Sequence, residues 1–133
     1  MRAPQIGPAT TQELYRSALD MVAWAEERGG IQVVVSEHHG SEDGYLPSPL
    51  VFAGALAGHT RTIPIQIAAL IVPLHDPMRL AEDMAVIDLL SGGRVSYVTA
   101  VGYVPDDYAM FDRSFKGRGK RMDECLDVMR KAW

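Results

Sequence analysis

Three largely apolar segments limit most strongly what this chain can fold into, and the first of them shows no polar alternation. They cover Ile31–Glu37, Ile65–Val72 and Arg94–Val101, and β-branched residues are frequent in them. An unbroken run of this kind is typical of a strand buried on both faces, as the strands of parallel sheets are. Helical patterns separate the runs, so the sequence predicts βαβ units and one α/β domain with a parallel sheet.

The segments around these runs carry helix signals. A Thr-x-x-Glu capping box at Thr10 begins the first helix, and Asp76 followed by Pro77 begins the third. Paired glycines end both of these helices. In the third helix Leu80, Met84 and Ile87 form an apolar stripe that we expect to pack against the sheet. The expected helices cover residues 11–28, 49–59 and 77–91, with a fourth from about residue 116.

Composition excludes several classes of function. The 133-residue chain has a formal net charge of −4, which disfavours binding to nucleic acid or to an anionic membrane. Its longest apolar stretch, Ile67–Leu74, is far shorter than a membrane span, and Met1–Thr10 does not resemble a secretory signal. Cys125 is the single cysteine, so no internal disulfide is possible. These features predict a cytoplasmic protein without a nucleic-acid or membrane partner.

Two architectures fit the alternation of strands and helices: an open doubly wound sheet and a (β/α)8 barrel. A G-x-G-x-x-G fingerprint and a P-loop are both missing, which weakens the nucleotide-binding form of the open sheet. In either architecture the functional residues lie where the strands end. Here those points are Glu37–His39, Pro73–His75 and Val101–Tyr103, the last of which opens an expected irregular loop over residues 102–111.

Histidines at the first strand end are the main candidates for chemistry. His38 and His39 should face opposite ways, because successive strand side chains alternate between the two faces of a sheet. One can act as a general base near neutral pH while the other orients the loop, and turn capping is the plainer alternative. A metal site built from Glu37, these histidines and His75 is a weaker alternative, since adjacent strand residues are poor co-ligands.

The paired alanines Ala68–Ala69 in the second run are unusual, because alanine is depleted in strands. They can fill a crowded interior, or they can leave room for a flat ring against the backbone. In the helix that begins near Lys116, a small basic run that includes Arg118 and Arg121 is expected to form a solvated face.

Several of these stretches, taken in order, resemble one family. The matching segments are Val35–His39, Gly44–Pro49, Ala68–Pro73, His75–Asp83 and Asp88–Arg94. They resemble the bacterial luciferase-like monooxygenases, and the resemblance extends from about Leu14 to Trp133. It implies a (β/α)8 TIM-type barrel, of which residues 1–133 form about half as a single partial domain, since a closed barrel needs about 250 residues.

The resemblance also implies a flavin, either FMN or coenzyme F420, and a small organic substrate. By the same resemblance His38 is catalytic, and a non-proline cis peptide falls at Ala68–Ala69. Val101 stands where the luciferase α chain has an arginine that helps to hold the FMN phosphate. The implied cofactor-binding residues are Glu37, Ala68, Ala69, Thr99 and Val101.

Three functions remain open at this point. The first is a flavin-dependent oxidoreductase or monooxygenase, or a fragment of one, that forms a homodimer or pairs with another half-barrel. The second is an inactive half-barrel that pairs with itself or with another chain. The third is a metal-dependent hydrolase barrel. A half-barrel leaves open sheet edges and an apolar inward face, formed by Val33, Val35, Ile65 and Ile67 or by their alternates.

Overall fold

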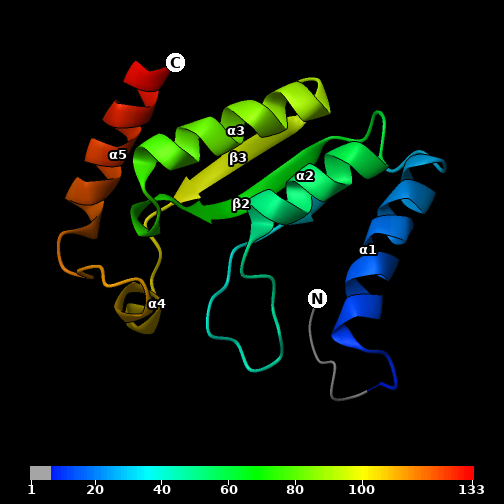
Figure 1. The fold of residues 1–133 in the computed structure, drawn as a ribbon, viewed down its shortest axis with the longest axis horizontal. Coiled ribbons are helices and arrows are strands. Elements are labelled where there is room, and N and C mark those ends of the chain that lie inside the picture. The colour runs from blue at the N-terminus through cyan, green and yellow to red at the C-terminus, as the bar shows by residue number, and fades with distance from the viewer. Residues whose placement is uncertain (1–6) are drawn as a thin grey trace.

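The three apolar runs form one parallel sheet in the order β1-β2-β3. The computed structural model describes residues 7–133, and Figure 1 shows the strands with helices beside them. Because every strand runs the same way, all three carboxyl ends lie at one edge of the sheet. The α/β prediction is therefore confirmed. The strands are β1 (Val33–Val35), β2 (Ile65–Ile71) and β3 (Val95–Ala100).

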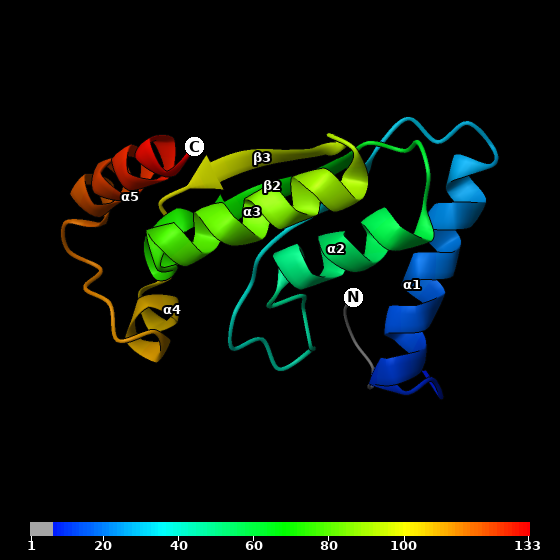
Figure 2. The same ribbon diagram turned by 45° about the horizontal axis from the view of Figure 1, so that its top comes forward.

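Helices cover one face of this sheet. Figures 1 and 2 show α2 and α3 lying against it, with α1 beside α2 and α5 beside α3. The capping box at Thr10 forms as expected, and the Asp76 carboxylate caps the third helix by accepting from two backbone amides. The helices are α1 (Thr11–Glu26), α2 (Pro49–His59), α3 (Pro77–Ser91), α4 (Pro105–Met110) and α5 (Arg118–Ala132), with a 3-10 turn, η1, at Val72–Leu74.

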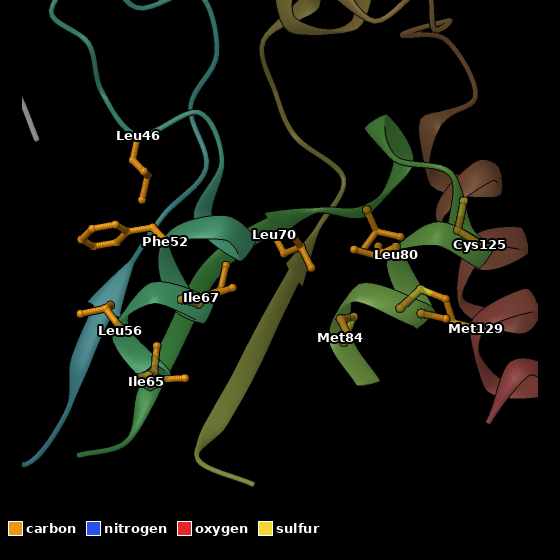
Figure 3. Close-up of a cluster of buried hydrophobic side chains, with 14 residues drawn as sticks. Leu46, Phe52, Leu56, Ile65, Ile67, Leu70, Leu80, Met84, Cys125 and Met129 are labelled. Carbon is orange, nitrogen blue, oxygen red and sulfur yellow. The ribbon is translucent and has the colours of Figure 1, made fainter. Parts of the chain in front are cut away.

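The core lies between the sheet and the helices. Ile65 and Ile67 of β2 are fully buried there, and the labelled side chains of Figure 3 surround them. The other face carries the alternate residues, and Val34 and Val98 are 55% and 46% exposed on it. The sequence left open which set of strand residues forms the uncovered face. It is the set that alternates with Val33, Val35, Ile65 and Ile67. The predicted burial of the α3 stripe is confirmed for Leu80, Met84 and Ile87.

Two elements differ from the sequence prediction. The first strand is shorter than Ile31–Glu37, and Ile31 itself is 90% exposed. The expected irregular loop over 102–111 contains the helix α4, which begins with Pro105 and has two aspartates in its first turn. Proline at the first position and acidic residues in the first turn both favour a helix start. Asp107 and Tyr108 are buried there, so the prediction of an irregular loop is wrong for this part of the segment.

Two charged side chains fasten the amino end of the sheet. The guanidinium of Arg94 donates to the carbonyl oxygens of Ala57, Thr60 and Ile63, at 2.9 to 3.2 Å. The carboxylate of Glu26, at the end of α1, accepts from the backbone amides of residues 61–63 at 2.6 to 3.0 Å. Glu26 ends α1 and Arg94 follows α3, and both bind the segment that connects α2 to β2. They therefore join these four elements at the amino end of the sheet.

Candidate functional site

The carboxyl edge of the sheet brings together segments that are distant in sequence. The loop after β1, the turn η1 with His75, and the segment after β3 all begin at this edge. His38 and the Val101–Tyr103 segment follow parallel strands and therefore lie at the same end of the sheet, as the sequence predicted. Polar and aromatic side chains from these segments form the candidate site.

Glu37 is the centre of this site. Its side chain is completely buried, and its Oε1 atom lies 2.9 Å from Nε2 of His39 and 2.8 Å from Nε2 of His75. The backbone amide of Ile71 donates to the other oxygen, Oε2, at 2.6 Å. Both carboxylate oxygens are therefore hydrogen-bonded within the protein.

These contacts determine the charge of Glu37. Burial by itself raises the pKa of the carboxyl, but hydrogen bonds from His39 and His75, the charge of His75 and the Ile71 amide outweigh it and hold the pKa at about 2. Glu37 is therefore ionised at neutral pH. An ionised carboxylate accepts hydrogen bonds and donates none.

The two adjacent histidines have different surroundings, although β1 ends at Val35 and strand alternation does not extend to them. His38 lies against the Tyr45 ring with centroids 3.9 Å apart, and its backbone amide donates to Leu46. The imidazole of His39 meets the Phe111 ring edge to face, with centroids 4.6 Å apart. The segment after β1 therefore brings two imidazoles with different neighbours to the carboxyl end of the sheet.

The paired alanines lie beside this cluster. The peptide bond between Ala68 and Ala69 is cis, as the resemblance implied. Both side chains are half-buried, and the backbone amide of Glu37 donates to the Ala69 carbonyl at 3.3 Å. Thr99 on the neighbouring strand is exposed, and so is Val101 directly after that strand ends. Small side chains thus lie on the uncovered face near the site.

Two arginines of α5 donate hydrogen bonds to backbone segments that border the site. Arg121 donates to the carbonyl oxygens of Pro73 at 2.7 Å and His75 at 3.3 Å, and Arg118 donates to that of Gly102 at 3.2 Å. For these two arginines the expectation of a solvated face is wrong. They bind the backbone where the segments after β2 and β3 begin.

A metal site is not supported by the part of the chain that the structure describes. Among residues 7–133 no group of three histidine, cysteine, aspartate or glutamate side chains is suited to hold an ion. The sequence places His75 at a functional strand end and as a possible metal ligand, but does not predict its bond to Glu37. Its position directly before the Asp76 cap, at the end of the second apolar run, was the available signal.

None of the helices within residues 7–133 has the length and apolar character needed to cross a membrane.

Comparison with known proteins agrees with this geometry. Residues 2–133 match the model of the family described as luciferase-like monooxygenase. The alkanal monooxygenase alpha chain of the Kryptophanaron alfredi symbiont is 28% identical over 120 residues, which are 90% of this chain and 34% of that protein. The chain spans about a third of the length of the curated relatives that it matches.

Solved structures show the same fold. Monooxygenase RslO1 from Streptomyces bottropensis superimposes with a TM-score of 0.87 at 28% identity, over 96% of this chain and 40% of that one. The oxygenating constituent of 3,6-diketocamphane monooxygenase from Pseudomonas putida, solved in complex with FMN, gives a TM-score of 0.86 at 22% identity, over 95% of this chain and 35% of that one. The strands and helices described here thus correspond to the N-terminal part of a TIM-type barrel, and the chain belongs to the luciferase-like monooxygenase family.

Proposed function

We propose that this chain supplies the N-terminal part of a flavin-dependent monooxygenase that acts on a small organic substrate. The observation that carries the proposal is the uncovered surface of small residues at Ala68–Ala69, directly beside the buried Glu37 and its two histidines. Ligands of TIM-type barrels bind at the carboxyl ends of the strands. FMN and coenzyme F420 both present a flat ring system of the shape that this surface fits.

The residues would divide the work between binding and proton transfer. Ala68 and Ala69 would lie against the ring, and Thr99 and Val101 would flank it. When bound, the flavin supplies the redox chemistry, while the protein orients the ring and excludes water. His38, packed on Tyr45, would hold or move a proton at the reacting centre. Glu37 was expected from sequence to contact the cofactor, and this stays a prediction.

The remaining part of the barrel must come from further polypeptide or from a partner. In the described residues β1 and β3 each have one neighbouring strand, and Val34 and Val98 are exposed on the face without helices. Unpaired strand edges and apolar patches favour association. We propose a homodimer or a pairing with another half-barrel, in the reducing cytoplasm that the single buried Cys125 fits.

A bulky side chain in the alanine pair tests the flavin proposal. Ala69→Phe should weaken flavin binding at least ~10-fold, because the new ring occupies the space that the cofactor needs; this corresponds to about 1.4 kcal/mol. Fluorescence titration with FMN and, separately, with F420 measures the affinity and identifies the preferred flavin. Ala55→Phe, on the exposed surface of α2, is the matched control. Equal flavin affinity in both variants would show that the alanines only fill space.

An inactive half-barrel that pairs with another chain is the second candidate, favoured by the open sheet edges. It predicts a stable dimer or heterodimer by light scattering and no flavin absorbance in the protein once free cofactor has been removed. Flavin binding by the assembled protein would exclude this candidate.

A further inference from the structure

The carboxylate of Glu37 contacts two imidazoles through a single oxygen atom. Nε2 of His39 and Nε2 of His75 lie 2.9 and 2.8 Å from Oε1, although the two histidines are 36 residues apart in sequence. Oε2 is bonded to the backbone amide of Ile71. The arrangement thus uses the carboxylate entirely for hydrogen bonds within the protein.

The chemistry of these bonds determines where the imidazole protons are. Because the ionised carboxylate only accepts, each Nε2 must carry the hydrogen that it donates. A neutral imidazole has one N–H, so Nδ1 of each ring then holds the lone pair. Neutral His39 and His75 are therefore restricted to one of their two tautomers.

Neighbouring groups keep both rings in place. Phe111 contacts the His39 ring, and the His39 side chain is only 7% exposed. Arg121 donates to the backbone carbonyl of His75, whose side chain is 25% exposed at the carboxyl edge. Of the two, His75 is the imidazole that a molecule at this edge can reach.

We propose that Glu37 is a positioning residue, which fixes His39 and His75 as Nε2–H tautomers and leaves Nδ1 of His75 as a proton acceptor at the mouth of the site. This deepens the proposed function, because it adds a second acid–base group beside His38. It also assigns Glu37 a role other than direct contact with the flavin.

Nitrogen-15 NMR of the histidines tests the assignment without any cofactor. The chain has four histidines, so His39→Gln and His75→Gln assign the signals directly. In the unaltered protein at a pH where the rings are neutral, His39 and His75 should each show a protonated Nε2, an unprotonated Nδ1 and a slowly exchanging Nε2–H proton. His59 provides an internal comparison, since it pairs with the exposed Asp20 at 3.1 Å and its proton should exchange too fast to observe.

Loss of the charge on Glu37 should release both rings. In Glu37→Gln the Nε2–H protons should exchange at least ~10-fold faster, because hydrogen bonds to charged groups are stronger than neutral ones by an amount of that order. Asp20→Asn, which removes the other carboxylate–histidine pair, should leave both signals unchanged. If Glu37→Gln does not fold, the tautomers in the unaltered protein still decide, since the proposal requires a protonated Nε2 and an unprotonated Nδ1 on both rings.

A proton on Nδ1 of either ring in the unaltered protein overturns the proposal, as does unchanged exchange in a folded Glu37→Gln variant. Flavin titration of the same samples is a separate measurement. Failure to bind flavin would count against the proposed function, while the tautomer result would still decide the role of Glu37.

Discussion

The two ends of the sheet both contain a carboxylate whose pKa is held at about 2, yet the two groups bind different partners. At the amino end Glu26 accepts from three consecutive backbone amides, so its charge fixes the main chain. At the carboxyl end Glu37 accepts from two imidazoles, so its charge fixes side chains that can exchange protons. The same lowered pKa therefore accompanies a structural role at one end and a proposed chemical role at the other.

This difference agrees with the usual arrangement of TIM-type barrels. Residues at the amino-terminal end of the strands stabilise the fold, and residues at the carboxyl-terminal end form the active site. Arg94 strengthens the contrast, since it too binds main-chain atoms at the amino end. Variants at the two ends should thus separate stability from site geometry.

The largest effect is expected for Arg94→Ala. Five hydrogen bonds from this guanidinium would be lost, and buried acceptors at the end of α2 would lose their donor. We expect the free energy of unfolding to fall by about 3 kcal/mol, measured by urea denaturation. Arg130→Ala, which removes an exposed ion pair with Asp127, is the control and should change stability by less than ~0.5 kcal/mol. Similar losses in the two variants would contradict the structural role of Arg94.

A smaller effect is expected from pH. For both Glu26 and Glu37 the folded-state pKa, at about 2, lies below the ordinary value of 4.5. A lowered pKa means that the stabilisation is complete above pH 4.5 and is lost as the pH falls toward about 2. Unfolding measured across this window should show stability declining with acidity.

Single variants sharpen the comparison in that window. Glu26→Gln and Glu37→Gln should each reduce the dependence of stability on pH, but only Glu37→Gln should alter the histidine signals. Glu27→Gln, whose carboxylate pairs with a side chain rather than with backbone amides, serves as the control. A Glu26→Gln variant with changed His39 or His75 signals would mean that the two ends are coupled.

The smallest effect is expected for Arg121→Met. This change keeps the apolar stem but removes the donors to the carbonyl oxygens of Pro73 and His75. Stability should fall by about 1 kcal/mol, while the Nε2–H proton of His75 should exchange faster. Lys120→Met, at an exposed ion pair one residue away, should change neither quantity. An unchanged His75 signal in Arg121→Met would show that α5 does not help to position this ring.

Periodicity was sufficient to predict the architecture. Unbroken β-branched runs gave parallel strands, and the spacing of Leu80, Met84 and Ile87 gave the buried side of α3. Capping chemistry predicted two helix starts at Thr10 and Asp76, since those bonds are local. Each of these features depends on residues close together in the chain.

The contacts of the site could not be predicted in the same way. The bond between Glu37 and His75 depends on the register of β1 against β2 and on the turn η1, which no short window of sequence contains. The roles of Arg94 and Arg121 were missed for a similar reason, because their acceptors lie 31 to 48 residues away. Helix α4 was different, since its proline and aspartates were a local signal that was read as a loop.

One irregularity in β2 has a consequence for how this sequence can change. Between Ala68 and Leu70 the pairing with β3 shifts, so that β2 carries one residue more than its neighbour over this stretch. The extra residue keeps Leu70 in the core, while the two alanines before it remain half-buried. The two halves of the strand thus differ in whether the odd-numbered or the even-numbered residues face the core. Substitutions that adapt the carboxyl half to a new ligand can accumulate without altering which residues of the amino half face the core.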